Sequence, residues 1–85
     1  MKKVTIYTTK ICPYCIKAKR LLDNKGVTYQ ELRVDENPEL AAEARQKSGG
    51  RKTVPQIFID DYHVGGCDDL YDLEREKKLD ELLVC

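Results

Sequence analysis

A strand pattern, a helix pattern and a second strand pattern follow one another in the first 34 residues, and this order constrains the fold more than any other feature. Lys3–Thr8 is short and rich in β-branched and aromatic residues, which predicts a strand. Gly26 predicts the end of the helix, and Val27–Val34 alternates as a second strand does. The helix is predicted from apolar residues that share one helical face: Ile11, Cys15, Ala18 and Leu22. Such a β-α-β unit favours parallel strands.

The middle of the chain carries the signals of a second helix. Asn37 is a preferred N-cap residue, and Pro38 fits the first helical position because its missing N–H would have no partner there. Gly49-Gly50 predicts the end of this helix. Its buried side is expected to consist of Leu40, Ala41 and Ala44.

The last third of the chain predicts a hairpin and a helix. Gln56–Ile59 and Tyr62–Val64 are short strand patterns separated by two aspartates, which favours an antiparallel hairpin over another crossover. Gly65-Gly66 closes this hairpin. Asp68–Leu83 is helical by composition, with a break expected near Glu74. Its core candidates are Leu70, Leu73, Leu79, Leu82 and Leu83.

Length and composition limit the class of the protein. At 85 residues and 41% hydrophobic residues the chain supports one modest core, so we expect a single domain over residues 1–85. The apolar stretch near the N-terminus is too interrupted for a signal peptide, and no apolar run is long enough to cross a membrane. We therefore expect a cytoplasmic protein with no membrane partner. Its 15 basic and 15 acidic residues give zero net charge, which does not favour binding to nucleic acid.

Four cysteines in a reducing compartment point to redox chemistry or metal binding rather than to structural bridges. Cys12 and Cys15 lie where the first strand passes into the helix, so unpaired N–H groups of the first turn point near the sulfur of Cys12. These groups and the charge of Lys10 stabilise a thiolate. Pro13 is tolerated in a first turn. Cys15 belongs to the apolar stripe and Cys12 falls off it, so we expect Cys15 to be the more buried thiol.

The spacing of three residues brings both sulfurs to one helical turn, close enough for a reversible disulfide. Two other interpretations stay open. The pair could be ordinary core cysteines, which the place of Cys12 off the core stripe disfavours. It could also supply half of a zinc site completed by His63 and Cys67, but the chain has no second CxxC and no zinc-finger spacing. Redox chemistry is the favoured interpretation.

Two further motifs carry weaker signals. Thr53-Val54-Pro55 precedes the hairpin and by itself predicts only a turn and a strand start. Gly65-Gly66-Cys67-Asp68-Asp69 opens the last helix, where free N–H groups can hold a carboxylate and an aspartate can hold an ammonium group. This pair of preferences matches the zwitterionic head of an amino acid. Aspartate at a helix N-terminus is also a routine capping choice, and that simpler interpretation stays open.

Cys-Pro-Tyr-Cys, Thr-Val-Pro and Gly-Gly-Cys-Asp-Asp occur here in one order and spacing, and together they resemble the dithiol glutaredoxins of bacterial type over nearly the whole chain. The resemblance implies an α/β, thioredoxin-like fold, with a four-stranded mixed sheet flanked by helices and a cis Val54–Pro55 bond beside the active site. It also implies a glutathione-dependent thiol–disulfide oxidoreductase that reduces protein–glutathione mixed disulfides and protein disulfides in cell redox homeostasis.

The resemblance also implies a role for each motif. Cys12 would be the nucleophile and Cys15 the resolving thiol, with glutathione as co-substrate, no tightly bound cofactor and no metal. A further basic or amide contact to the glycine carboxylate of glutathione is expected from Arg45, Gln46, Arg51 or Lys52. The residues expected to contact glutathione are Lys10 at that carboxylate, Tyr14 packed against the ligand, Thr53, Val54 and Pro55 beside its backbone, and Cys67 and Asp68 at its γ-glutamyl group.

The expected partners are glutathionylated or disulfide-containing proteins, among which the family suggests ribonucleotide reductase, and the protein is expected to act as a monomer. Two alternatives to this enzyme stay open. Some relatives hold an iron–sulfur cluster between two subunits with two glutathiones, which Pro13 disfavours here. A glutathione-independent, thioredoxin-like electron donor is disfavoured by Tyr14 and the Gly-Gly-Cys-Asp-Asp motif. Outside the assigned roles, His63 is expected at the surface near the hairpin turn, Cys67 as a small cap residue, and Cys85 as an exposed terminal thiol without a role.

Overall fold

The computed structural model describes residues 2–51 and 53–83, which form one four-stranded sheet and four helices. The elements are β1 (Val4–Thr8), α1 (Pro13–Asn24), β2 (Tyr29–Arg33), α2 (Pro38–Lys47), β3 (Gln56–Ile59), β4 (Tyr62–Gly65), α3 (Cys67–Arg75) and α4 (Leu79–Leu83). The strand order is β2-β1-β3-β4, with β1 parallel to β2 and antiparallel to β3, and with β3 and β4 as an antiparallel hairpin. The predicted mixed sheet with flanking helices is confirmed.

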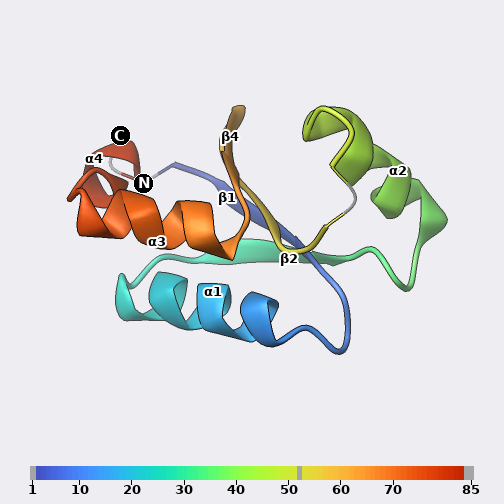
Figure 1. The fold of residues 1–85 in the computed structure, drawn as a ribbon, viewed down its shortest axis with the longest axis horizontal. Helices are drawn as coiled ribbons and strands as arrows, with labels where there is room; N and C mark the ends of the chain where they lie inside the picture. Colours follow the sequence, from blue (N-terminus) through green and yellow to red (C-terminus); the bar gives the residue numbers. More distant parts are fainter. Residues whose placement is uncertain (1, 52, 84–85) are drawn as a thin grey trace.

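The sheet separates two hydrophobic clusters. Figure 1 shows α1 and α3 on one side of the sheet and α2 on the other. Alternate residues of β1 face opposite sides, so Val4 and Ile6 join the larger cluster with α1, α3 and α4, whereas Tyr7 joins the smaller one beneath α2. In the smaller cluster the ring of Tyr7 meets the edge of Phe58, with centroids 5.7 Å apart. Both faces of β1 therefore pack against a hydrophobic cluster.

The first helix begins two residues later than the apolar stripe suggested. Cys12 is the N-cap of α1 and Pro13 is its first residue, so Ile11 lies in the preceding loop and is 87% exposed. The prediction that Ile11 belongs to the buried stripe is wrong, because helical periodicity does not extend past the N-cap. Within the helix the stripe is confirmed from Cys15 onward, and Leu21 is buried beside it.

The second helix has the predicted start. The side chain of Asn37 caps α2 by accepting the N–H of Glu39 at 2.9 Å, and Pro38 occupies the first helical position. Leu40 and Ala41 are only half-buried, while Ala44 is buried as expected. The strand before this helix is shorter than the predicted Val27–Val34.

The C-terminal segment forms two helices, as the expected break indicated. α3 ends at Arg75 and α4 begins at Leu79, close to the break predicted near Glu74. The start of α3 differs from the prediction, because Gly66 is the N-cap and Cys67 is the first helical residue rather than the cap.

None of the helices formed by residues 2–51 and 53–83 combines the length and the apolar character needed to cross a lipid bilayer. Lys52 and Cys85 lie outside the described residues.

A carboxylate just after β2 ties the loop before α1 to the sheet. Asp35 Oδ2 accepts the backbone N–H of Lys10 at 3.0 Å, and the two carboxylate oxygens accept Nε and Nη2 of Arg33 at 2.9 and 2.8 Å. These donors, the guanidinium of Arg33 foremost, lower the pKa of the Asp35 carboxyl to about 2. Lys10 lies two residues before Cys12, so this interaction holds the chain that leads into α1.

We expect Asp35→Asn to lower the free energy of unfolding at neutral pH and to weaken its dependence on pH in acid. A carboxyl whose pKa is depressed by folding stabilises the fold above its unfolded pKa of about 3.9, and this contribution is lost as the pH falls through the folded value of about 2. Urea unfolding at about pH 7, 4 and 2.5 measures the effect.

Glu36→Gln is the matched control for this prediction. Glu36 Oε1 lies 3.1 Å from Arg33 Nη1 but is largely exposed, and such surface pairs contribute little to stability. A loss in Glu36→Gln equal to the loss in Asp35→Asn, or an unchanged acid dependence in Asp35→Asn, would contradict the role given to Asp35.

Candidate functional site

A disulfide joins Cys12 and Cys15 at the N-terminus of α1, with their Cα atoms 5.2 Å apart. The N–H of Cys15 donates to Cys12 Sγ at 3.1 Å. Cys15 is 1% exposed and Cys12 is 7% exposed, so the prediction that Cys15 is the more buried thiol is confirmed. Cys12 is more buried than its place off the apolar stripe indicated, because its sulfur faces Cys15 and lies 3.9 Å from the carbonyl oxygen of Val54.

The surroundings of Cys12 Sγ favour a negative charge. The first turn of α1 contains no acidic residue, and its N–H groups form the positive end of the helix dipole. The N–H of Cys15 already points at the sulfur, and hydrogen bonds to an ionised acceptor are stronger than those to a neutral one. Once the disulfide is reduced, the helix end therefore stabilises a thiolate at Cys12 more than at Cys15.

An open pocket of about 410 Å³ is lined by Tyr14, which lies between the two cysteines in the chain, and by Val54, whose carbonyl oxygen is 3.9 Å from Cys12 Sγ; neither cysteine belongs to the lining itself. Three segments that are distant in the sequence line it: the first turn of α1, the loop before β3 and the start of α3. In Figure 1 the N-terminal ends of α1 and α3 face the same way, toward the side of the molecule where α2 lies. The lining residues are Tyr14, Arg51, Thr53, Val54, Pro55, Gly66, Cys67, Asp68 and Asp69.

The pocket brings together most of the residues expected to contact a ligand. Six of them line it: Tyr14, Thr53, Val54, Pro55, Cys67 and Asp68. Lys10 does not belong to this lining; it is exposed in the loop before α1, where its backbone binds Asp35. The Val54–Pro55 peptide bond is cis, as the resemblance implies.

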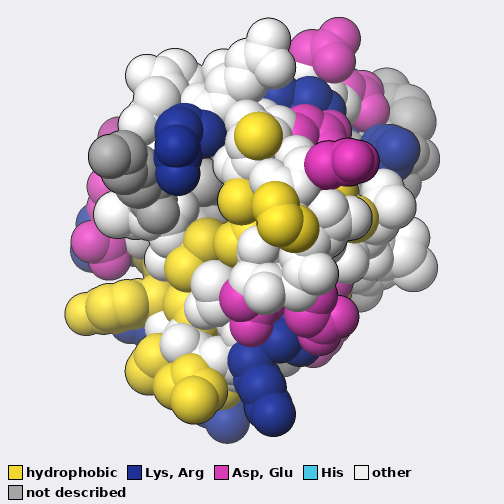
Figure 2. Space-filling view, turned by 90° about the vertical axis from the view of Figure 1, so that its right-hand side faces the viewer, with side chains coloured by type: hydrophobic (Ala, Val, Ile, Leu, Met, Phe, Trp, Pro, Cys, Tyr) yellow, Lys and Arg dark blue, Asp and Glu magenta, His cyan; other side chains and the backbone are white. Residues whose placement is uncertain are grey.

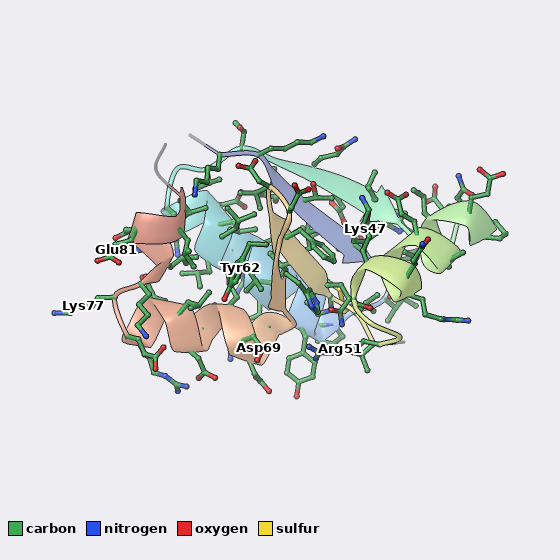
Figure 3. All side chains as sticks on the ribbon, turned by 90° about the horizontal axis from the view of Figure 1, so that it is seen from above. Lys47, Arg51, Tyr62, Asp69, Lys77 and Glu81 are labelled. Atoms are coloured by element: carbon green, nitrogen blue, oxygen red, sulfur yellow. A yellow bond between two sulfur atoms is a disulfide. The ribbon has the colours of Figure 1, made fainter. Side chains whose placement is uncertain are left out.

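Three lining residues add to the predicted contacts. Gly66 and Asp69 were not predicted to contact the ligand, and Arg51 was only one of four candidates for a basic or amide contact. Gly66 donates its N–H to Asp69 Oδ2 at 2.9 Å, and Asp69 lies 3.5 Å from Arg51 Nη1. Figure 3 shows Arg51 and Asp69 next to each other at the start of α3. Arg51 was one of four candidate cations or amides, and Arg45 lines a neighbouring pocket of about 60 Å³. Both aspartates of the motif line the pocket, and the sequence alone does not show that Asp69 is the one that accepts the N–H of Gly66.

Cys67 lines the pocket, and its thiol is buried and protonated. The side chain is buried, and burial raises the pKa of the Cys67 thiol; Asp68 raises it further, while Lys17 acts in the opposite direction. A neutral, buried thiol is a poor nucleophile. Its N–H and that of Asp68 belong to the first turn of α3, where a helix leaves N–H groups without intrahelical partners.

His63 lies in β4, near the hairpin turn as expected, but it is less exposed than a surface residue. It is half-buried, its ring stacks on Phe58 with centroids 4.8 Å apart, and its Nε2 lies 2.7 Å from Gln56 Oε1. Among residues 2–51 and 53–83 no group of three or more His, Cys, Asp or Glu side chains is arranged to hold a metal ion. The cysteine pair, His63 and Cys67 are therefore not grouped as the ligands of one ion in this structure.

Exposed apolar side chains lie around the start of α1. Ile11, Tyr14 and Ile16 are among the large hydrophobic residues left exposed. Figure 2 looks onto this end of the molecule and shows hydrophobic side chains gathered in a band from the centre of the view to its lower left. An apolar surface beside a reactive disulfide suits contact with another protein.

A disulfide within one helical turn, next to an open pocket, has the properties of a reversible couple, because its two thiols remain close to each other when it is reduced. The thiolate-stabilising helix end adds the reactivity that such a couple needs. Fold and site together define a thiol–disulfide oxidoreductase with a CxxC pair.

Comparison with known proteins gives the family. The sequence profile named Glutaredoxin matches residues 4–64. The chain is 60% identical over 83 residues to a glutaredoxin of Pseudomonas aeruginosa, covering 98% of each chain, and 55% identical over 83 residues to glutaredoxin 3 of Escherichia coli K12, covering 98% of this chain and 99% of that protein. The protein is thus a member of the glutaredoxin family.

Solved structures agree with this assignment. The glutaredoxin of Brucella melitensis has a TM-score of 0.85 at 57% identity, covering 98% of this chain and 89% of that one. A buckwheat glutaredoxin–glutathione complex has a TM-score of 0.85 at 32% identity, covering 94% of this chain and 74% of that one. The thioredoxin-like fold that the sequence motifs imply is confirmed.

Gly65 allows β4 to pass close to the start of α3. Its φ is +116°, which side chains rarely adopt. A Cβ at this position would overlap the carboxylate of Asp69 and lie 3.1 Å from Arg51 Nη1. The side chain that caps α3 therefore depends on the absence of one at Gly65.

We expect Gly65→Ala to lower the free energy of unfolding by about 1 kcal/mol or more, from backbone strain and from displacement of the Asp69 cap. Gly49→Ala is the matched control, because Gly49 also has a positive φ, +74°, but a Cβ there would meet nothing within 4 Å. Urea unfolding of both variants compares the two costs. Equal losses would show that the contact with Asp69 contributes nothing.

Proposed function

We propose that the protein is a glutathione-dependent oxidoreductase that reduces protein–glutathione mixed disulfides and protein disulfides, with Cys12 as nucleophile and Cys15 as resolving thiol. The pocket of about 410 Å³ beside the disulfide carries the proposal. Its lining combines the first turn of α3 with its N–H groups, two carboxylates and the loop before β3, which together suit a charged peptide. One relative of known structure is a glutaredoxin–glutathione complex.

The γ-glutamyl end of glutathione binds at the start of α3 in this proposal. The N–H groups of Cys67 and Asp68 receive its carboxylate, and the exposed carboxylate of Asp68 receives its ammonium group. The acidic first turn of α3 supports this arrangement, because it supplies negative charge to a ligand that also carries positive charge.

The rest of glutathione lies along the other walls of the pocket. Thr53, Val54 and Pro55 offer backbone groups to its peptide bonds, and the half-exposed ring of Tyr14 packs against it. Arg51 supplies a positive charge to a carboxylate of the ligand from within the lining, and Lys10 contributes charge from the loop before α1. In this placement the ligand's sulfur lies next to Cys12.

Reduction of a mixed disulfide needs Cys12 alone. The Cys12 thiolate attacks the glutathione sulfur of a protein–glutathione disulfide, the old S–S bond breaks, and the target protein leaves as a thiolate that takes up a proton. A second glutathione thiolate then attacks the Cys12–glutathione disulfide. Oxidised glutathione leaves and the Cys12 thiolate is restored.

Reduction of a protein disulfide needs both cysteines. Cys12 attacks one sulfur of the target and forms a mixed disulfide with it, and Cys15 then attacks Cys12 Sγ and releases the reduced target. The Cys12–Cys15 disulfide that remains is the form in the present structure, and two glutathiones reduce it.

The proposal also covers the target proteins, the cellular compartment and the oligomeric state. The exposed apolar side chains around α1 give a target protein a surface to contact, and glutathionylated or disulfide-containing proteins, ribonucleotide reductase included, are the proposed targets. A reversible couple works where thiols are kept reduced, so we place the protein in the cytoplasm, as a monomer and a single domain over residues 1–85. Glutathione is its co-substrate, and no tightly bound cofactor takes part.

We expect Cys12→Ser to abolish glutathione-dependent turnover of a small mixed disulfide, measured in a coupled assay with glutathione reductase. Cys15→Ser should keep that turnover and lose reduction of a protein disulfide, because only the second reaction needs a resolving thiol. Absence of turnover in the reduced wild type would refute the proposed function. Equal loss of both activities in Cys15→Ser would refute the division of roles between the cysteines.

We expect Arg51→Met to raise KM for a glutathione mixed disulfide by about fivefold and to leave kcat within about twofold, since a partly exposed charge-assisted contact contributes about 1 kcal/mol. The same steady-state assay measures both constants. Arg75→Met is the matched control, because Arg75 is exposed at the far end of α3. An unchanged KM in Arg51→Met would exclude Arg51 from ligand binding.

A further inference from the structure

Side-chain hydrogen bonds run from β4 through β3 to the loop that lines the pocket. His63 Nε2 lies 2.7 Å from Gln56 Oε1. Gln56 Nε2 in turn donates to the carbonyl oxygen of Thr53 at 3.0 Å and to Thr53 Oγ1 at 3.1 Å. These bonds connect β4, β3 and the loop before β3. Of the three residues, only Thr53 lines the pocket.

The chemistry of the groups fixes the direction of these bonds. The carbonyl oxygen of Thr53 can only accept, so the nitrogen of the Gln56 amide must face it and the amide oxygen must face His63. His63 Nε2 therefore carries a hydrogen and donates it. Thr53 Oγ1 accepts from Gln56, which leaves its own hydroxyl hydrogen free to turn toward the pocket.

The bond to the Thr53 carbonyl also orients the next N–H. In a planar trans peptide the C=O of one residue and the N–H of the next point in opposite directions, and the Thr53–Val54 bond is not among the cis peptides. Because the Thr53 carbonyl points toward the Gln56 amide, the N–H of Val54 points away from Gln56. Within residues 2–51 and 53–83 the Val54 N–H has no backbone acceptor outside the helices and strands.

Packing keeps the side chains of His63 and Gln56 in place, and we call this pair the relay. Gln56 is 1% exposed, so an unpaired amide there would carry a large desolvation cost. The His63 ring stacks on Phe58 at an interplanar angle of 24°, which limits its rotation. Burial and the nearby Arg51 lower the pKa of His63, with Asp69 opposing them, so the ring is neutral at physiological pH and its single N–H is committed to Gln56.

We propose that His63 and Gln56 are positioning residues for glutathione: they hold the Thr53–Val54 peptide so that the Thr53 hydroxyl and the Val54 N–H are presented to the ligand as donors. This inference deepens the proposed function and rests on it. Neither side chain lines the pocket, so their effect on the ligand passes through the loop.

His63→Phe separates the hydrogen bond from the packing. Phenylalanine can keep the stack on Phe58 but cannot donate to Gln56 Oε1, so the buried amide loses its anchor. Gln56→Met keeps the length of the side chain and removes both bonds to Thr53. Val64→Ala is the matched control, because Val64 is the neighbour of His63 in β4, is buried in the other cluster, takes no part in the hydrogen bonds of His63 and Gln56, and does not line the pocket.

We expect His63→Phe and Gln56→Met each to raise KM for a glutathione mixed disulfide about threefold to fivefold with kcat within about twofold, since one buried hydrogen bond contributes about 1 kcal/mol. The double variant should resemble Gln56→Met alone, because both changes break the same connection. Val64→Ala should lower the unfolding temperature and leave KM unchanged. If His63→Phe behaves as Val64→Ala does, or if the two relay variants are additive, the proposal is overturned.

A second readout does not depend on turnover. In the ligand-free protein, the side-chain amide hydrogens of Gln56 should exchange slowly with solvent and the amide signal of Val54 should shift when His63 is replaced by Phe, as seen by nitrogen–proton NMR. Unchanged exchange and shift would refute the relay even if the wild type is active. If the wild type shows no glutathione-dependent turnover, the proposed function fails, and the NMR result alone decides whether the relay holds the loop.

Discussion

The burial of β1 on both faces and along both edges is the constraint on which the site depends. β1 pairs with β2 on one side and with β3 on the other, and its residues alternate between the two hydrophobic clusters. Because β1 and β3 are antiparallel, the end of β1 lies beside the start of β3, where Tyr7 pairs with Gln56. Cys12 follows the first of these ends and Val54 precedes the second. The sheet thus brings Cys12 Sγ and the Val54 carbonyl to 3.9 Å across 42 residues of sequence.

The first turns of α1 and α3 both line the pocket, and they differ in the charge that they favour. The start of α1 has no acidic residue and stabilises a thiolate, whereas the start of α3 carries Asp68 and Asp69. Asp69 accepts the N–H of Gly66 and pairs with Arg51. The carboxylate of Asp68 has neither of these partners and is available to a ligand in the pocket. Burial keeps the thiol of Cys67 protonated, so a third cysteine beside the pocket does not compete with the reactive pair.

The parts of the structure that depend on local spacing could be predicted from the sequence, and the parts that depend on tertiary contacts could not. The Asn37 cap of α2, the cysteine pair and the mixed sheet follow from local signals and the order of motifs. Ile11 was misplaced because its spacing fits the helix although it precedes the N-cap. His63 was expected at the surface because no local signal reports its bond to Gln56 or its stack on Phe58. Arg51 could not be separated from its basic neighbours, since only the fold brings it to Asp69.

Thiol chemistry and ligand recognition therefore have different physical origins in this protein. The groups that stabilise the Cys12 thiolate lie within one turn of α1, so their geometry is set by the helix itself. The pocket is assembled from three segments and its loop is held by side chains in β3 and β4. A substitution behind the loop can change the affinity for a ligand without touching the sulfur pair, and a substitution in the first turn can do the reverse. The contact between Cys12 Sγ and the Val54 carbonyl is where the two parts meet, so changes that move this loop are the ones that can couple binding to reactivity.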